Sequence, residues 1–396
     1  MNILFVNSSR TWGGGERWLM DICAGLRDRG HSVYVICQKE SALEDRISTV
    51  TTSYTSLNIT GDFNPFTVFD IYRLIKQWKI QLVCTNFEKD LRIGGMAARA
   101  AGVPVILSRE VDIPIKNKWI TRLFFSRIAS GILVNSYATL NTLLVSSPWL
   151  KQQCIEVVWK GIGPYSQRPE EPSLIRQMYK LSDTRTLVGF VGRIDEQKGI
   201  PTLLDAIRIA VIHSPDLTLM MAGEGNMTEQ IEEYTRTHHL EENIILAGFQ
   251  KNVESFLRAM DFVVIPSYWE GFGYAALEAM ALKKAIVATH ASSLPEIIED
   301  GRTGILVPPR SAEKLAEAIL TLAGDPGLRE KMGRAGAERV KQTFTLQMMV
   351  SKTEKFFETI IGKGSIQNPA DKRKNGTQSY SIERIEDQNT VSEHVP

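Results

Sequence analysis

Short apolar runs alternate along this chain with stretches in which apolar residues recur every three or four positions. In the first half the apolar runs lie at 2–6, 33–37, 82–85, 103–107, 132–135 and 155–159. In the second half they lie at 187–193, 217–222, 244–247, 262–265, 285–288 and 305–307. Such runs favour buried strands, and the stretches between them favour amphipathic helices. The alternation predicts two doubly wound parallel sheets, each covered by helices on both faces.

The chain has 396 residues, which favours two domains over one. Residues 161–183 contain few apolar positions and several glycines and prolines, so they predict the connection between the domains. We therefore expect Rossmann-like domains over 1–165 and 180–346, and a C-terminal helix over 347–362 that packs back towards the first domain. The polar residues 363–396 predict a disordered tail.

Composition narrows the class of protein further. The hydrophobic content is 43%, the charged content 23% and the formal net charge +1, so no global field attracts nucleic acid, and we expect no nucleic-acid partner. Four dispersed cysteines favour free thiols in a reducing compartment. The chain has no basic leader and no apolar run of about 18 residues, which predicts a cytoplasmic protein or one attached to the cytosolic face of a membrane.

Residues 261–281 carry the strongest functional signal. An apolar run from Asp261 to Pro266 leads through a Gly-x-Gly turn into strong helix formers from Tyr274 to Ala281. A strand, a glycine turn and a helix start place free N–H groups at one point, which suits a phosphate. Glu270 and Glu278 flank that point, and carboxylates repel phosphate, so we interpret them as acceptors for hydroxyl groups. The stretch predicts a sugar-nucleotide site; the alternative is a glycine-rich turn with a solvated glutamate.

Two cations follow an apolar run in the second half. Arg193 lies where that run ends, and Lys198 precedes a helix opened by Gly199. A leaving diphosphate needs such charges, because stabilisation of a developing anion is usually the largest catalytic contribution. The alternative is that both are solvated cations on a loop.

Glycines also occupy the first turn of the chain, at Gly13, Gly14 and Gly15. The dinucleotide fingerprint Gly-x-Gly-x-x-Gly requires a third glycine, but Gly15 is followed by Glu16, Arg17 and Trp18. A nicotinamide oxidoreductase is therefore disfavoured. The alternative for these glycines is a flexible turn. Asn7, Asn86 and the segment 108–112 also follow strands, so they point into the predicted crevice.

Residues 116–127 interleave four basic side chains with five apolar ones. A basic, aromatic helix can lie in a membrane interface. The alternative is a surface helix whose apolar stripe packs on the sheet. RNA binding is a third possibility, but no RNA-binding module surrounds the segment.

No metal or cofactor is expected. The chain contains no Asp-x-Asp, which commonly holds a nucleoside diphosphate through a divalent ion, and its one adjacent histidine pair, His238 and His239, is assigned to the surface.

Together these residues resemble the family-4 retaining glycosyltransferases, whose GT-B fold places two Rossmann-like domains on either side of a cleft. The resemblance is strongest over 189–304 and rests on Gly192-Arg193 with Lys198-Gly199, on the 266–281 stretch with its glutamates at 270 and 278, and on 295–304. In the first half it includes Gly13 to Glu16.

The resemblance implies a role for each matching residue. Arg193, Lys198 and Glu270 are the catalytic candidates: the two cations would bind the donor diphosphate, and Glu270 the transferred sugar. Glu278 would bind the ribose hydroxyls. The implied donor site also contains Gly14, Gly15, Gly192, Gly271, Phe272, Gly273, Tyr274 and Ala275.

The acceptor side departs from the family pattern. Many members have a histidine after the strand that ends near residue 107, where this chain has Ser108, Arg109, Glu110 and Asp112. The acceptor-side candidates are Asn86, Arg109, Glu110 and Asp112.

The sequence thus predicts a retaining, metal-independent transferase that moves a sugar from a nucleoside diphosphate to a hydroxyl group. The acceptor would be a glycan or lipid-linked molecule, in lipopolysaccharide or other surface glycan synthesis, and 116–127 would contact the inner membrane surface. The alternatives are a nucleotide-sugar epimerase of similar fold and a non-catalytic sugar-nucleotide binding protein.

Overall fold

Seven parallel strands form one sheet in the N-terminal half of the chain. The computed structural model describes residues 1–165 and 173–365. The strand order is β3-β2-β1-β4-β5-β6-β7. The strands are β1 Asn2–Asn7, β2 Ser32–Gln38, β3 Ser53–Leu57, β4 Leu82–Thr85, β5 Val105–Arg109, β6 Gly131–Val134 and β7 Ile155–Val157. The order reverses direction at β1 and β4, so ligands are expected beyond the carboxyl ends of these strands.

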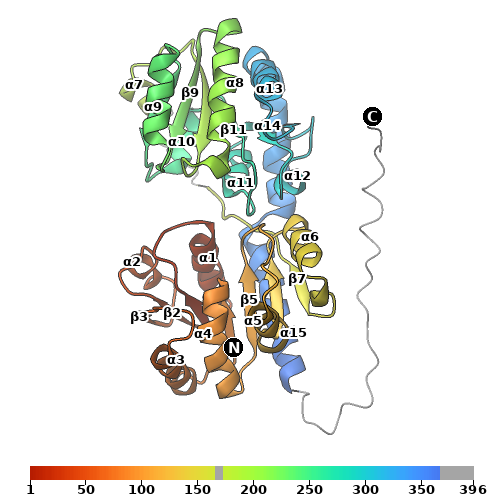
Figure 1. Cartoon of the computed structure of the whole chain (residues 1–396). Coiled ribbons are helices and arrows are strands. Elements are labelled where there is room, and N and C mark those ends of the chain that lie inside the picture. Colours follow the sequence, from red (N-terminus) through yellow and green to blue (C-terminus); the bar gives the residue numbers. More distant parts are fainter. Residues whose placement is uncertain (166–172, 366–396) are drawn as a thin grey trace.

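Six further strands form a second parallel sheet in the C-terminal half. Its order is β10-β9-β8-β11-β12-β13. The strands are β8 Thr186–Val191, β9 Leu217–Ala222, β10 Ile244–Gly248, β11 Phe262–Ile265, β12 Ala285–Thr289 and β13 Ile305–Val307. The prediction of two doubly wound sheets is confirmed, and Figure 1 shows them as two bodies stacked on each other.

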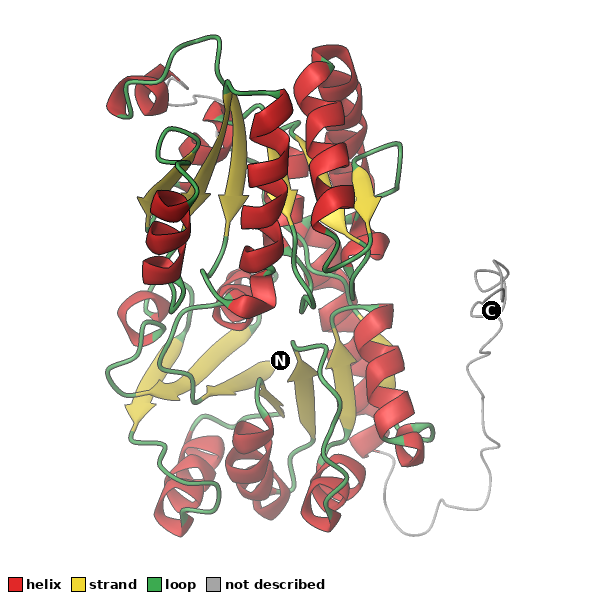
Figure 2. Ribbon diagram, turned by 45° about the horizontal axis from the view of Figure 1, so that its top comes forward, coloured by secondary structure: helices red, strands yellow, loops and turns green. Residues whose placement is uncertain are grey.

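Helices pack against both sheets (Figure 2). In the N-terminal half they are α1 Gly14–Asp28, α2 Glu44–Ile47, α3 Pro65–Gln77, α4 Glu88–Ala101, α5 Trp119–Leu123, the π-helix η1 Phe124–Ile128, α6 Tyr137–Ser146 and the 3-10 helix η2 Pro148–Leu150. Within residues 173–365 they are α7 Ser173–Met178, the 3-10 helix η3 Glu196–Lys198, α8 Ile200–His213, α9 Thr228–Thr237, α10 Val253–Ala259, α11 Tyr274–Ala281, α12 Leu294–Ile297, α13 Ala312–Gly324, α14 Pro326–Thr343 and α15 Leu346–Ser365.

The first strand shows why each sheet needs helices on both faces. Successive strand side chains point to opposite faces. In β1, Ile3 and Phe5 therefore join one buried cluster, while Leu4 and Val6 join another. All four are fully buried, so neither face of the strand is exposed to water.

The chain passes between the halves twice, and the two passages touch. Ile162 donates its N–H to the Phe344 carbonyl at 3.0 Å and accepts from Leu346 N–H at 3.0 Å. A Cβ on Gly161 would lie 2.2 Å from the Thr345 carbonyl oxygen, so only glycine permits this approach. Beyond this point α15 packs on the N-terminal half, where Phe357 is buried in the same cluster as β1 residues.

The structure differs from the sequence expectations in four places. Strand β3 was not predicted, because its sequence Ser-Tyr-Thr-Ser-Leu is polar and lies at the sheet edge. The segment 116–127 is not one continuous helix: α5 begins only at Trp119 and changes to the π-helix η1 at Phe124. Helix α7 lies inside the segment expected to connect the domains. The expected tail lies outside the described residues from 366 onward, and residues 363–365 end α15.

Two further properties concern the described residues only. Cys23, Cys37, Cys84 and Cys154 are free thiols, the first three of them buried. Within 1–165 and 173–365, no helix combines the length and the apolar composition that crossing a membrane requires.

Candidate functional site

The turn before α11 places Glu270 against a cation. Gly273 caps α11 with a φ of 106°, a conformation that favours glycine. Glu270 lies in this turn and is 8% exposed. Its Oε2 accepts hydrogen bonds from Lys198 Nζ at 2.6 Å and from Ser267 Oγ at 3.1 Å. Two residues that lie far apart in the sequence, and that were both predicted to bind the donor, therefore form a direct charge-assisted contact.

Lys198 reaches Glu270 because two loops pack closely against each other. Gly199 follows η3 with a φ of 70°. A Cβ at this position would lie 1.9 Å from the Pro266 carbonyl oxygen, so a larger residue would separate the loops. The loop contact is completed by a hydrogen bond of 2.9 Å from Tyr268 N–H to the Gln197 carbonyl.

Arg193 is placed differently from Lys198. Its side chain is 66% exposed and pairs with Asp195 at 3.2 Å, and it donates to Gln197 Oε1 at 2.8 Å. Gly192 borders the Lys198 side chain, since a Cβ there would lie 3.6 Å from Lys198 Cε. The structure thus brings Lys198 to Glu270 and leaves Arg193 on the more open side of the same loop.

Glu278 is held by a residue from the other half of the chain. Arg17 of α1 donates from Nη1 to Glu278 Oε1 at 2.5 Å. The same guanidinium lies over the Tyr274 ring, 4.5 Å from its centroid. Any hydroxyl that binds Glu278 must share the carboxylate with Arg17. Sequence reasoning missed Arg17, and its position directly after the Gly13–Glu16 motif was the available signal.

Helices α1 and α11 begin on facing sides of the junction between the two halves (Figure 1). A Cβ on Gly14, the first residue of α1, would lie 3.5 Å from the Tyr274 ring, and one on Gly15 would lie 3.9 Å from Glu110 Cγ. The first N–H groups of each helix have no partner within their own helix. Two helix N-termini therefore meet at one point, which favours an anion there.

The remaining predicted donor-site residues contribute in different ways. Phe272 is buried, with its ring centroid 6.2 Å from that of Phe344, so its side chain belongs to the core. Ala275 packs partly buried against the same core. Gly271 instead touches the N-terminal half, because a Cβ there would lie 2.6 Å from the Glu110 carbonyl oxygen.

The four acceptor-side candidates do not form one cluster. Asn86 is 3% exposed, and neither atom of its amide has a hydrogen-bond partner among the described residues. Asp112 Oδ1 is likewise buried without a partner in the described part of the chain. Arg109 pairs with Glu88 at 3.5 Å, whereas Glu110 has a different partner. Buried polar groups normally have hydrogen-bond partners. The unpartnered atoms of Asn86 and Asp112 are therefore candidates to bind polar atoms of a ligand.

Glu110 forms a buried ion pair with Lys160, a residue that sequence reasoning missed. Lys160 is 2% exposed, and its Nζ lies 4.5 Å from the centroid of the Trp18 ring. Burial lowers the pKa of Lys160 to about 8, against the opposing effect of the Glu110 carboxylate. Burial also raises the pKa of neighbouring Asp21 to about 6. Lys160 follows a strand, as Asn86 does, so the same rule could have found it.

Glu296 joins the halves through three hydrogen bonds. It accepts from the backbone N–H groups of Tyr137 at 3.0 Å and Ala138 at 2.7 Å, and from Trp159 Nε1 at 2.8 Å. Tyr137 and Ala138 form the first turn of α6, where a carboxylate is favoured by the helix dipole. Glu296 therefore caps a helix of the opposite half, a role that sequence reasoning did not predict.

Within the described ranges, no group of three His, Cys, Asp or Glu side chains has the arrangement that could hold a metal ion. The positive charges at the junction are supplied by Lys198, Arg193 and Arg17.

Both halves of the chain match known families. Residues 173–339 match the family described as Glycosyl transferases group 1. Residues 12–163 match the family described as Glycosyltransferase Family 4.

Individual relatives show the same relationship. Alpha-D-kanosaminyltransferase of Streptomyces kanamyceticus is 32% identical over 165 residues, which are 41% of this chain and 42% of the relative. The capsular polysaccharide biosynthesis glycosyltransferase CapM of Staphylococcus aureus is 29% identical over 48% of this chain and 50% of its own length. The chain spans about half the length of these curated relatives. The lipopolysaccharide core biosynthesis glycosyltransferase LpsD of Rhizobium meliloti is 24% identical over 89% of this chain and 97% of its own length.

Solved structures share the whole fold. The structure of Anabaena HepE in complex with UDP and glucose has a TM-score of 0.80 at 22% identity, covering 91% of this chain and 100% of that one. The apo form of the lipopolysaccharide outer core galactosyltransferase WaaB has a TM-score of 0.67 at 16% identity, covering 92% and 99%. The sequence matches in both halves, together with this shared architecture, show that the chain belongs to the group 1, family 4 glycosyltransferases and has their GT-B fold.

Proposed function

We propose that this chain is a retaining, metal-independent glycosyltransferase that moves a sugar from a nucleoside diphosphate to a hydroxyl group of an acceptor. The observation that carries the proposal is the convergence of Lys198, Glu270 and Glu278 with the N-termini of α1 and α11 at one junction. Cations and helix N-termini bind phosphates, and carboxylates bind hydroxyls. HepE, which shares the fold, binds UDP and glucose, and this supports a donor of the same chemical class.

The geometry suggests a division of roles. Lys198 and Arg193, with the N–H groups of Gly14, Gly15 and the start of α11, would hold the diphosphate. Glu270 would hold the sugar and Glu278 the ribose. In the reaction, the bond between the anomeric carbon and the diphosphate oxygen breaks while the acceptor oxygen bonds to the same face of that carbon. The acceptor proton passes to the leaving diphosphate, so neither glutamate has to act as a general base.

The source of positive charge supports the proposed metal independence. Lys198 supplies a cation 2.6 Å from Glu270, and preorganised charges of this kind stabilise a leaving diphosphate without a divalent ion. Activity should therefore persist in EDTA.

Two relatives and the segment 116–127 support a place in surface glycan synthesis, at the cytosolic face of the membrane. LpsD and CapM are named for lipopolysaccharide and capsular polysaccharide synthesis. The segment 116–127 would provide the peripheral membrane contact. Phe124 and Phe125 of this segment are buried, while Trp119 and the basic residues are exposed, so part of its apolar surface packs on the protein and part is free.

The decisive experiment is a donor screen followed by a transfer assay. UDP-, GDP- and ADP-sugars are tested by thermal shift, and NMR then determines the anomeric configuration of the product. Lys198→Met should lower the transfer rate by about 100- to 1,000-fold. Lys331→Met, at an exposed position on α14, is the matched control and should be unchanged.

Other outcomes identify other functions. Donor binding without transfer or hydrolysis would indicate a sugar-nucleotide binding protein. Conversion of the donor sugar without any acceptor would indicate an epimerase. An inverted product would overturn the retaining mechanism.

A further inference from the structure

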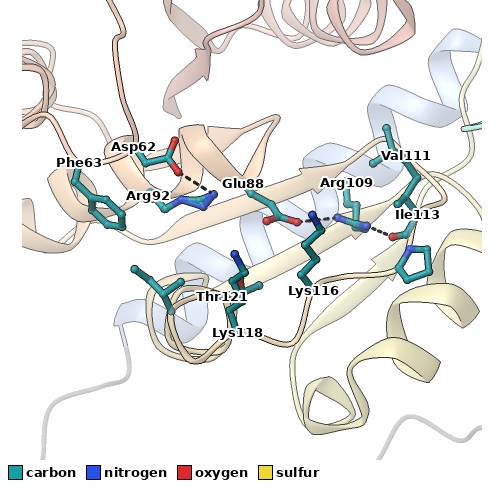
Figure 3. Close-up of a pocket in the computed structure, with 12 residues that line it drawn as sticks. Asp62, Phe63, Glu88, Arg92, Arg109, Val111, Ile113, Lys116, Lys118 and Thr121 are labelled. Carbon is teal, nitrogen blue, oxygen red and sulfur yellow. Dashed lines mark hydrogen bonds and ion pairs between the residues drawn. The ribbon is translucent and has the colours of Figure 1, made fainter.

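A pocket of about 480 Å³ opens on the N-terminal half, and none of the residues that line it belongs to the proposed donor site. It is bordered by the loop before α3, the first turns of α4 and the segment 109–121 (Figure 3). Its volume is in the range of ordinary ligand sites.

The pocket carries excess positive charge. Four cationic side chains line it, Arg92, Arg109, Lys116 and Lys118, against two acidic ones, which leaves two net positive charges. The arginines are already paired, Arg92 with Asp62 at 3.3 Å and Arg109 with Glu88 at 3.5 Å. Lys116 and Lys118 are exposed, and neither forms a salt bridge with a described residue. Figure 3 shows both lysines reaching into the space beside the paired arginines. This arrangement favours an anionic ligand.

One wall of the pocket is apolar and continues onto the surface. Phe63 lines it, is 46% exposed and lies 5.9 Å, centroid to centroid, from the Phe124 ring. Phe66 and Phe69 follow one turn apart on α3 and are 80% and 58% exposed, and Trp119 is 76% exposed. These three aromatic residues do not line the pocket, but they follow its lining residues Phe63 and Lys118 closely in the chain. Exposed aromatic residues of this kind mark an interaction surface for a non-polar partner.

One loop runs from the pocket to the proposed transfer point. Arg109, which lines it, is followed by Glu110, whose carbonyl oxygen touches Gly271 beside Glu270. The loop that follows β5 therefore connects the pocket with the proposed donor site.

We propose that this pocket binds a phosphate group of a lipid-linked acceptor, with the two free lysines neutralising the phosphate and the Phe63 wall contacting the lipid. The proposal rests on the proposed function only in calling the ligand an acceptor. A water-soluble sugar phosphate shares the anionic group, but it would leave the exposed aromatic wall without a partner.

The test is equilibrium binding of three probes to the full chain: geranyl diphosphate, pyrophosphate and geraniol. Each is titrated alone and with the nucleoside diphosphate that most stabilises the protein held at saturation, so that the donor site cannot account for the binding. Geranyl diphosphate should bind in both conditions and more tightly than pyrophosphate, and geraniol should not bind measurably.

Two variants separate the charge from the apolar wall. Lys116→Gln with Lys118→Gln should weaken geranyl diphosphate and pyrophosphate binding by about tenfold or more. The control, Lys39→Gln with Lys151→Gln, removes the same charge from exposed positions of the same half and should change affinity less than twofold. Phe63→Ala should weaken only geranyl diphosphate, by about fivefold. Phe249→Ala, at a position 62% exposed in the other half, is its control.

Unchanged affinity in the lysine variant, or no binding of either diphosphate, would overturn the phosphate site. Equal binding of pyrophosphate and geranyl diphosphate, with no effect of Phe63→Ala, would overturn the lipid-linked assignment in favour of a soluble phosphate. Failure of the proposed function is separate: it would appear as absent donor binding while the lysine-dependent binding of geranyl diphosphate persists.

Discussion

Replacing Lys160 with methionine should destabilise the protein strongly, although the lysine itself is a buried charge. The substitution removes the partner of Glu110 and leaves that carboxylate in a site where its side chain is 9% exposed. Removing one member of a buried ion pair typically costs about 3 to 5 kcal/mol. We expect the free energy of unfolding to fall by this amount at pH 7, where Lys160 is mainly protonated.

Glu110→Gln should cost less than Lys160→Met. Without its carboxylate partner, Lys160 loses its proton more readily, because burial already lowers its pKa to about 8. The double variant with Gln at 110 and Met at 160 contains no buried charge at this site, so it should lie within about 1 kcal/mol of the parent. Its cost should therefore be well below the sum of the two single costs.

The same ion pair predicts a pH dependence with a definite sign. The pKa of Lys160 is about 8 in the folded protein, against 10.5 as its ordinary value, so between these pH values the unfolded chain binds more protons. Stability contributed by this group therefore rises with pH across that window, by about 3 kcal/mol in full and about 2 kcal/mol between pH 7 and pH 9.5. The double variant should lack this rise.

Urea unfolding followed by tryptophan fluorescence measures these differences, since Trp18 lies 4.5 Å from Lys160 Nζ. A stabilising buried pair is excluded if both single variants stay within about 1 kcal/mol of the parent, which is the range of exposed ion pairs. It is also excluded if the double variant costs the sum of the single variants.

Three further substitutions test the junction. Gly271→Ala would place a Cβ 2.6 Å from the Glu110 carbonyl oxygen, so small-angle scattering should show the two halves further apart and the transfer rate should fall. Gly324→Ala is the control, because open space surrounds this glycine, and it should change neither quantity. Glu278→Gln should weaken nucleoside diphosphate binding about tenfold in calorimetry, and unchanged affinity would exclude Glu278 from the ribose site. Glu296→Gln removes the carboxylate that caps α6 from the opposite half, so amide exchange in the first turn of α6 should become faster; unchanged protection there would contradict the capping role.

Much of the fold could be predicted because its signals are local. The twelve predicted strands are short apolar runs, and the structure contains a strand at each of them. Helix α11 begins at Tyr274 as expected, because a strand, a glycine turn and helix-forming residues occur in immediate succession. Strand β3 was missed because an edge strand needs no continuous apolar sequence.

Pairings across long distances in the sequence could not be predicted from the same signals. Arg109 and Glu110 are neighbours and were grouped as acceptor-side candidates, yet one contributes to the pocket beside α4 and the other pairs with Lys160. Adjacent residues at the end of a strand point to opposite sides, so their partners depend on which other elements pack there.

Local patterns in the sequence are sufficient for the alternating elements, the two sheets and the order of the donor-site motifs, because periodicity and glycine positions act over a few residues. The packing of the folded chain brings Arg17 to Glu278 and Lys198 to Glu270, and it leaves Lys116 and Lys118 without ion-pair partners in the described chain. Those outcomes depend on how the two halves and their loops pack, and no local pattern of residues records that packing.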